Sequence, residues 1–455
     1  MPTVMKFGGT SVADAHAFEN VARIVASQRS GAPVVVVSAM SGVTDALLNA
    51  TVAAGEGRAG EAIASLEDTF HRHHKTAAEL LTPTAAQNFA KQVDNAAHQI
   101  SELLRTSADN PLRRRPTQDA VLAFGEMLSS ELLAELLNER GTKAQQVDAR
   151  RCILTDDEYT CALPLMPDTF FKAHDVLVPV IENGLVPVLG GFIASTAEGN
   201  TTTLGRGGSD YTAALIGAAL TAVEIQIWTD VTGVLTADPR VVPAAQTVER
   251  LSYAEASELA YFGAKVLHPK TIQPAIEGRI PVRICNSRAP EQIGTLVGPQ
   301  TETTDRTIKA IAHKASVTTV QISSARMLGA YGFLRALFEV FERHKTVVDV
   351  VATSEVSVSL SLDDASALPV IVTELEQLGT VRVEKGCAII CVVGEGLRGT
   401  PGIAARVFSA ISDINVTLIS QGASSINFTF AIEEERVEEA VKRLHAEFFE
   451  HHGSN

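Results

Sequence analysis

Short, mostly apolar runs that alternate with helical stretches constrain this chain more than any other feature of its sequence. Such runs occupy residues 34–38, 185–189, 225–229 and 281–285, and amphipathic segments lie between them. Strands that are apolar on both faces are typical of a parallel sheet covered by helices. We therefore expect residues 1–297 to form an α/β domain with an open sheet sandwiched by helices.

The C-terminal part of the chain is organised differently. A polar stretch at 298–306 is typical of a linker, and shorter elements follow it. They repeat the order strand, helix, strand, strand, helix, strand, which predicts two ferredoxin-like βαββαβ domains at 307–385 and 386–455. The second set lacks its last strand. The spare strand at 307–313 is a candidate to be donated to it, which would interleave the two domains.

Composition excludes several classes of partner. The 455-residue chain has a formal net charge of −15 and no apolar run long enough to span a bilayer. Nucleic-acid surfaces need clustered Lys and Arg, so we expect no nucleic-acid partner and no membrane. A first strand begins almost at once, which predicts a cytoplasmic protein without a transit peptide. The cysteines form no CxxC pairs and are expected to be reduced core thiols: Cys152, Cys161, Cys285, Cys387 and Cys391.

A first glycine-rich segment, KFGGTS at residues 6–11, lies where the first strand gives way to a helix. Consecutive glycines let backbone N–H groups approach a phosphate, and a helix N-terminus adds positive potential. Lys6 would place an ammonium on a transferring phosphoryl group. Taken alone, a Lys beside a Gly-Gly turn is more often an ordinary strand end, and GxxxxGK[ST] is absent.

A second segment, TTTLGRGGSD at residues 201–210, has the composition of an anion-binding loop. Arg206 can fork onto a carboxylate, and Asp210 could orient Lys6 or organise metal-bound phosphates. The alternative is a glycine-rich turn in which Asp210 caps the helix that follows.

A third segment leaves a buried strand at Trp228 and continues through Asp238-Pro239-Arg240. Loops at the carboxyl ends of strands are where open α/β sheets bind nucleotides. Arg240, and Lys265 in GAKVLHP, could neutralise phosphates there. Taken singly, each is more often a solvated surface charge.

In order and spacing, the segments KFGGTSV, TTLGRGGSD, WTDV with DPR, and GAKVLHP resemble the motifs of aspartate kinases. The resemblance implies transfer of the γ-phosphate of ATP to the β-carboxylate of L-aspartate, giving 4-phospho-L-aspartate. This is the first step of lysine, threonine and methionine biosynthesis. The resemblance also implies Mg²⁺ on the phosphates but assigns it no direct protein ligand. Two alternatives stay open: a kinase of this fold for another amino-acid carboxylate, and a catalytically idle amino-acid sensor.

The family's functional positions can be placed on matching residues of this chain. Lys6, Gly8 and Gly9 would contact the transferring phosphoryl group, and Asp210 would align Lys6. Glu126 would receive the substrate ammonium and Arg206 its α-carboxylate. The substrate site as a whole would comprise Ser38, Ala39, Thr44, Glu126, Phe192, Thr203, Arg206 and Ser209. ATP would contact Lys6, Gly8, Gly9, Thr229, Asp230, Leu235, Asp238, Arg240 and Lys265, with Leu235 replacing an aromatic residue common in the family.

The two C-terminal repeats resemble a pair of ACT domains, which are amino-acid-sensing modules. The first resembles the lysine pocket of the monofunctional, lysine-sensitive type, which implies feedback inhibition by lysine. Its implied effector residues are Met327, Ala330, Gly332, Phe333, Leu334, Val348, Asp349, Ser354 and Glu355, with Ala330 where a close pattern has serine. The apolar members also suit the core stripe of an amphipathic helix. ACT sheets usually pair with one another, so we expect a homodimer or a tetramer.

One motif favours a different interpretation. GEGLRG at residues 394–399 satisfies GxGxxG after a strand, as in a dinucleotide site. The surrounding strands belong to the βαββαβ repeat and no further parallel units remain, so we expect no dinucleotide there.

Overall fold

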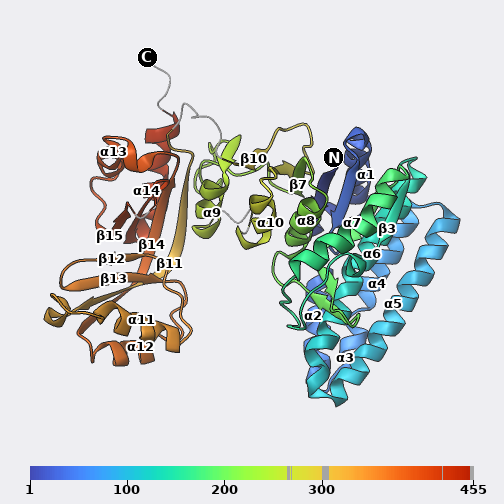
Figure 1. Cartoon of the computed structure of the whole chain (residues 1–455), viewed down its shortest axis with the longest axis horizontal. Helices are drawn as coiled ribbons and strands as arrows, with labels where there is room; N and C mark the ends of the chain where they lie inside the picture. Colours follow the sequence, from blue (N-terminus) through green and yellow to red (C-terminus); the bar gives the residue numbers. More distant parts are fainter. Residues whose placement is uncertain (264–266, 268, 300–306, 423, 451–455) are drawn as a thin grey trace. The chain divides into compact units, whose positions relative to one another are not determined.

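The computed structural model describes residues 1–263, 267, 269–299, 307–422 and 424–450 (Figure 1). The chain packs into two compact units. The first comprises Met1–Val234 and Leu267–Gln300, and the second comprises Leu235–Val266 and Thr301–Asn455. Residues 235–266 thus pack with the C-terminal part, although the sequence placed them in the α/β domain. The predicted linker at 298–306 lies almost wholly outside the described residues.

A sheet of mostly parallel strands forms the middle of the first unit, in the order β3-β4-β2-β1-β7-β9-β10. All neighbours are parallel except β10, which is antiparallel to β9. Every residue of β2 is buried, as its uninterrupted PVVVV sequence predicts. The strands are β1 (Thr3–Phe7), β2 (Pro33–Val37), β3 (Ala144–Val147), β4 (Val186–Gly190), β7 (Glu224–Thr229), β9 (Val282–Asn286) and β10 (Thr295–Gly298).

Helices cover this sheet, and several of them pack on one another beyond it (Figure 1). Pro83 at the first position of α5 separates this helix from α4, which ends at Leu80. The helices are α1 (Ala15–Ser27), α2 (Val43–Gly55), α3 (Ala59–Ala64), α4 (Glu67–Leu80), α5 (Pro83–Asp109), α6 (Arg114–Glu139), α7 (Met166–Glu182), α8 (Gly208–Ala219) and α10 (Gln273–Glu277). A small hairpin of β5 (Ile193–Ser195) and β6 (Thr201–Thr203) follows β4.

Register places the carboxyl ends of four parallel strands together. Phe7 is the partner of both Val37 and Trp228, and Val37 is the partner of Gly190. The residues that follow these positions therefore leave the sheet at one edge, where open α/β sheets bind their ligands.

The second unit contains a six-stranded antiparallel sheet in the order β12-β13-β11-β14-β16-β15. β11 and β14 are long, and each runs through both halves of the sheet. Their bounds, with those of the other elements, are β8 (Arg250–Ser252), α9 (Tyr253–Tyr261), β11 (Ala310–Ser323), α11 (Phe333–Arg343), β12 (Val351–Thr353), β13 (Ser357–Leu362), α12 (Leu368–Leu375), β14 (Thr380–Val393), α13 (Ile403–Ala410), β15 (Val416–Gln421), β16 (Asn427–Glu433) and α14 (Val437–His445).

The two halves of this sheet share their central strands. Residues 310–314 pair with 389–393 in the second half, and residues 317–323 pair with both β13 and β14 in the first half. Where the sequence suggests separate strands, the structure has continuous ones with a local bend. The bend occurs at Ser316 (φ 59°) and Gly386 (φ 72°), beside a register shift in the β11–β14 ladder.

GEGLRG at 394–399 does not begin a nucleotide-binding helix. Its strand, β14, belongs to the antiparallel sheet, and a single 3₁₀ turn, Leu397–Gly399, follows it. A Cβ at Gly394 would lie 1.9 Å from the carbonyl oxygen of Thr307. This glycine therefore serves close backbone packing.

Four of the cysteines are buried thiols, as expected, but Cys161 is exposed because it lies on a turn. In the part of the chain that the structure describes, none of the helices is long and apolar enough to cross a membrane.

Candidate active site

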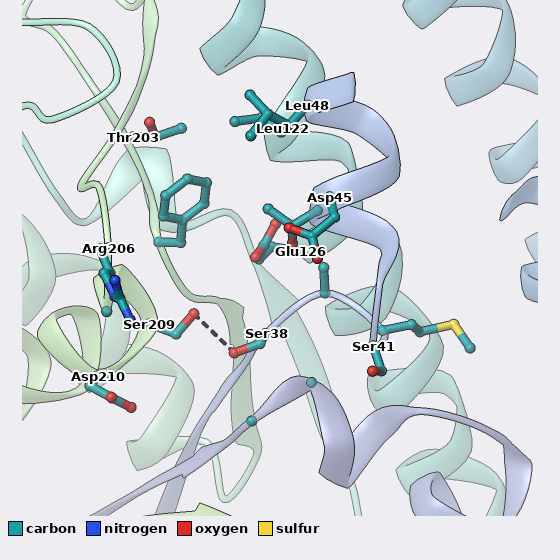
Figure 2. A pocket seen from close by; sticks show the side chains of 18 of the residues that line it. Ser38, Ser41, Asp45, Leu48, Leu122, Glu126, Thr203, Arg206, Ser209 and Asp210 are labelled. Atoms are coloured by element: carbon teal, nitrogen blue, oxygen red, sulfur yellow. Dashed lines mark hydrogen bonds between the residues drawn. The ribbon is translucent and has the colours of Figure 1, made fainter. Parts of the chain in front are cut away.

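A cavity of about 980 Å³ opens at the carboxyl edge of the first unit's sheet. Three sets of residues line it: the glycine loop after β1, the loop after β2, and the turn between β6 and α8. Helices α2 and α6 close another side (Figure 2). Its lining includes these predicted site residues: Lys6, Gly8, Gly9, Ser38, Ala39, Thr44, Glu126, Phe192, Thr203, Arg206, Ser209, Asp210, Thr229 and Asp230.

An ion pair lies at the base of the cavity. Lys6 Nζ is 2.6 Å from Asp210 Oδ1, and the two side chains are 12% and 18% exposed. Lys6 lies on β1 and Asp210 lies in the first turn of α8, whose N-cap is Gly207. Asp210 is therefore not the helix cap that the sequence left open, and its carboxylate instead holds the Lys6 ammonium in place.

The glycine loop keeps its backbone close to neighbouring loops. The Gly8 N–H donates to the carbonyl of Trp228 at 3.1 Å, and a Cβ at Gly9 would lie 3.0 Å from the carbonyl oxygen of Ala39. A side chain at Gly9 would press on the loop after β2, and a Cβ at Gly8 would lie 3.6 Å from Lys6 Nζ. The requirement for glycine here is therefore steric, since Gly9 does not adopt positive φ.

A second close approach joins β4 to α8. Ser38 Oγ donates to Ser209 Oγ at 3.0 Å (Figure 2), and a Cβ at Gly191 would lie 2.6 Å from Ser209 Cβ. The first turn of α8 can approach the strand ends only because Gly191 carries no side chain. The N-terminus of α8, the positive end of its dipole, therefore faces the region around Ser38.

Glu126 is the most perturbed acid of the site. Its side chain is 3% exposed, and Oε2 has no hydrogen-bond partner among the described residues. Burial raises the pKa of Glu126 to about 8, and a hydrogen bond from the Ala39 backbone offsets part of that rise. A buried carboxylate with an unpaired oxygen that lines a cavity is suited to a cationic ligand group.

Arg206 supplies the opposite charge. It lies in the turn between β6 and α8, flanked by Gly205 (φ 72°) and Gly207 (φ 74°), and its side chain reaches the cavity (Figure 2). It makes no ion pair with any residue that the structure describes. A guanidinium that is free in this way can fork onto a carboxylate. The cavity thus offers one ligand a cation and a buried acid that an ammonium group would favour in its ionised form.

Some of the residues predicted to contact ATP belong to the second unit. Leu235, Asp238 and Arg240 belong to the second packing unit, where Arg240 Nη2 lies 2.6 Å from Asp238 Oδ2. The Arg240 guanidinium lowers the pKa of the Asp238 carboxyl. Lys265 lies outside the described residues. Their contacts with a nucleotide stay a prediction.

Sequence reasoning missed several cavity residues on α2 and α6. The missed residues have a helical spacing from predicted ones, since Leu48 follows Thr44 by four and Leu122 precedes Glu126 by four. Extending the predicted positions by one helical turn would have found them. The further missed side chains are Thr10, Met40, Ser41, Asp45, Gln118 and Thr160.

The predicted effector residues lie in the first half of the six-stranded sheet. Met327, Phe333 and Val348 pack against one hydrophobic core, and Gly332 (φ 82°) is the N-cap of α11. Asp349 accepts a hydrogen bond from Tyr261, and its Oδ2 is buried without a partner among the described residues. Ala330 and Leu334 flank that cap, while Ser354 and Glu355 form the turn between β12 and β13. Whether these residues bind an effector stays a prediction.

Family models match both parts of the chain. The amino acid kinase family model matches residues 1–286, and an ACT domain model matches residues 390–448. The second model therefore covers the second of the two C-terminal repeats.

Curated relatives match over nearly the full length. Lysine-sensitive aspartokinase 3 of Escherichia coli is 38% identical over 457 residues, covering 98% of this chain and 99% of that protein. The chloroplastic aspartokinase 1 of Arabidopsis thaliana is 39% identical, covering 98% of this chain and 80% of the relative.

Solved structures agree with this match. The structure of E. coli aspartokinase III with aspartate and ADP, in the R-state, is 36% identical with a TM-score of 0.80, and it covers 99% of this chain and 100% of that one. The T-state structure of the same enzyme with lysine and aspartate has a TM-score of 0.81 at 36% identity, covering 98% and 99%. With 38% identity to a relative that it matches end to end, this chain belongs to the amino acid kinase family, as an aspartokinase with a C-terminal ACT region.

Proposed function

We propose that this aspartokinase transfers the γ-phosphoryl group of ATP to the β-carboxylate of L-aspartate, in the cavity beside Lys6. One observation carries the proposal: a single cavity holds a fixed Lys6–Asp210 pair, a buried Glu126 whose Oε2 has no partner among the described residues, and an Arg206 without an ion pair among them. Glu126 and Arg206 match the ammonium and the α-carboxylate of an amino acid, which leaves a side-chain carboxylate to react. The E. coli relative solved with aspartate and ADP supports this choice of substrates.

The reaction needs positioning and charge neutralisation more than it needs a base. The β-carboxylate is already ionised at neutral pH, so no proton has to be removed before it attacks. An oxygen of that carboxylate attacks the γ-phosphorus, the bond from phosphorus to the bridging oxygen breaks, and ADP leaves with the electron pair. Lys6 neutralises charge on the transferring group. N–H groups of the glycine loop add hydrogen bonds, other than those of Gly8 and Ser11, which already donate to backbone carbonyls.

Asp210 acts through Lys6. A carboxylate 2.6 Å from the ammonium holds it at the strand end. Without that anchor the four-carbon stem of Lys6 is free to adopt other rotamers, and the ammonium no longer has one position in the ground state.

Mg²⁺ is proposed to enter with the nucleotide. Kinases bind this ion through substrate phosphates and one or two carboxylates, and it neutralises phosphate charge when bound. Asp210 and Asp230 line the cavity with Lys6, so the residues present fit such a partial coordination. Among the described residues no group of three His, Cys, Asp or Glu side chains is arranged to hold a metal ion.

A hydroxylamine-trapping assay tests the substrate assignment. Purified protein with ATP, Mg²⁺ and aspartate is expected to form aspartyl hydroxamate, whereas glutamate and N-acetylglutamate are expected to give little. A higher rate with either alternative would move the assignment to another carboxylate. Binding of aspartate without any turnover would favour the idle-sensor alternative.

Lysine is proposed as a feedback inhibitor that binds near Asp349. The half-buried Asp349 carboxylate has an unpaired oxygen and therefore suits an ammonium, and a relative of this chain is named for its lysine sensitivity. Inhibition requires lysine to bind one state of the enzyme better than another. In the trapping assay, product formation should fall on addition of millimolar lysine; unchanged activity would count against lysine and call for a test of threonine.

The quaternary state and the compartment are also proposed here. Self-pairing of ACT regions predicts a homodimer or a tetramer, which light scattering at micromolar concentration would separate from a monomer. The cytoplasm is the proposed compartment, although the Arabidopsis relative is named as chloroplastic.

A further inference from the structure

Asp119 is a buried acid that the proposed phosphoryl transfer does not use. It lies on α6, seven residues before Glu126, and seven residues are two helical turns, so both side chains leave the same face of the helix. The Asp119 side chain is 0% exposed, and no ion pair joins it to any described cation. Burying a carboxylate without a cation is costly unless hydrogen bonds replace its water.

Three hydrogen-bond donors converge on Asp119 from two segments. Oδ2 accepts from the Thr160 N–H at 2.9 Å and the Thr203 N–H at 3.0 Å, and Oδ1 accepts from Thr203 Oγ1 at 2.7 Å. An ionised carboxylate accepts at both oxygens and donates nothing, which suits it to three converging hydrogens. Burial raises the pKa of Asp119, while these hydrogen bonds act in the opposite direction.

Both anchored segments form the wall of the cavity. Thr160 and Thr203 line it, and Figure 2 shows Thr203 on the same side of the cavity as Arg206. Thr160 has φ 76°, a conformation that is strained for a β-branched residue and that needs support from its surroundings. The hydrogen bond from its N–H to Asp119 supplies such support.

We infer that Asp119 is a positioning residue for aspartate, because it fixes the Thr160 turn and the end of β6 as the wall against which the substrate binds. This inference rests on the proposed function of the cavity. The hydrogen bonds of Asp119 within the described residues go to Thr160 and Thr203, and none goes to Lys6, Asp210 or the glycine loop. Its loss should therefore weaken aspartate binding and leave the nucleotide side of the cavity unchanged.

Steady-state kinetics of three variants test the inference. Asp119→Ala removes all three acceptor contacts and should raise the KM for aspartate roughly tenfold or more, with the KM for ATP within about twofold of wild type. Asp119→Asn keeps one acceptor oxygen for the two N–H groups, so its KM for aspartate should lie between those of wild type and Asp119→Ala. Adding Thr160→Gly to Asp119→Ala should recover part of the loss, since glycine adopts positive φ without strain.

The matched control is Ser130→Ala, a fully buried α6 residue whose hydroxyl donates only to Met127 O, and it should leave both KM values unchanged. Equal rises in the KM for aspartate and for ATP would show a merely structural role and overturn the inference. So would a wild-type KM for aspartate in Asp119→Asn, a variant that keeps the shape of the side chain even if Asp119→Ala does not fold. Absence of aspartyl hydroxamate from the wild type would instead refute the proposed function.

Discussion

The fold changes the acid–base properties of single residues at this site. Glu126 is an ordinary acid in the sequence, but the packing of α6 against β4 removes its water. A Cβ at Gly190 would lie 2.9 Å from Glu126 Cβ, which shows how closely strand and helix approach there. Burial then raises the pKa of Glu126 to about 8.

This shift makes stability depend on pH in a defined direction. Between the unfolded pKa of 4.5 and the folded pKa of about 8, the folded protein retains a proton that the unfolded chain has lost. Stability contributed by protonated Glu126 is therefore complete at low pH and is lost as pH rises through this window. In thermal unfolding, the Tm of Glu126→Gln should rise relative to that of wild type as the pH increases from 5 to 8. Above pH 8 the difference in Tm should stay constant. Saturating aspartate should reduce the difference, because an ammonium compensates the buried charge.

Lys6 provides a second prediction at the residue scale. Lys6→Met keeps the length of the side chain but removes the ammonium held by Asp210. The kcat for aspartyl hydroxamate formation should fall by roughly 10²–10³, as when one transition-state donor is lost elsewhere. The KM for aspartate should change less than kcat. A variant with wild-type kcat would exclude Lys6 from phosphoryl transfer.

At this site a helix and a strand end pack closely because a glycine lies between them. Gly191 lets the first turn of α8 lie against the end of β4, because a Cβ there would be 2.6 Å from Ser209 Cβ and 2.8 Å from its Cα. The contact involves backbone and Cβ atoms, so no rotamer change can relieve it. The position of Ser209 and Asp210 therefore depends on a glycine two strands away from Lys6.

Gly191→Ala should displace the start of α8 and lower kcat/KM for aspartate by at least tenfold, since misplacement of about 1 Å can cost 10² in rate. The control is Gly60→Ala in α3, where an added Cβ meets nothing within 4 Å. That change should leave activity unaltered and favour the helix slightly. Equal activities of the two variants would contradict the argument.

Helix α4 carries a pH-sensitive element of its own. His73 is fully buried, and burial lowers its pKa to about 4, with its ring nitrogen Nδ1 2.8 Å from the Thr69 carbonyl. Because the folded pKa lies below the ordinary histidine value of 6.5, stability is lost as pH falls from 6.5 towards 4. His73→Gln should reduce the acid-induced drop in Tm over that range. If Tm falls as steeply with acid pH in the variant as in wild type, groups other than His73 cause the fall.

At the scale of the whole molecule, the 235–266 segment connects part of the predicted ATP site with the predicted effector site in the sequence. It packs with the C-terminal unit, where the Tyr261 hydroxyl donates to Asp349 and Lys314 lies over the Tyr261 ring, 4.9 Å from its centroid. Burial raises the pKa of Asp349, and its neighbour Asp363 adds to that effect. The Asp349 carboxylate, proposed to bind the effector, therefore already accepts a hydrogen bond from Tyr261, two residues before the GAKVLHP segment begins at Gly263.

Two substitutions test this arrangement through lysine inhibition. Asp349→Asn should raise the lysine concentration for half-inhibition at least tenfold, as expected when a charged hydrogen bond is lost. Tyr261→Phe should lower it, because a donor that competes with the lysine ammonium is removed. In the double variant the Tyr261 change should have no further effect. An effect of Tyr261→Phe that persists without the Asp349 carboxylate would show that it acts elsewhere.

The sequence alone determined the fold class and the glycine-loop side of the cavity, because these depend on local patterns. Apolar runs such as Val34–Val37 specify buried parallel strands, and glycine pairs such as Gly8-Gly9 specify a close backbone approach. The motifs also predicted many of the residues that line the cavity and the ACT region downstream, whereas Leu235, Asp238 and Arg240 belong to the second unit.

Only the tertiary structure decided the properties that depend on contacts between distant residues. It brought Asp119 to Thr160 and Thr203, removed water from Glu126, and joined two predicted strands into each of β11 and β14. Burial and hydrogen bonding across tens of residues leave no periodic trace in the sequence. They follow from packing, because whether a carboxylate is an ordinary surface acid or a buried, perturbed one depends on what surrounds it.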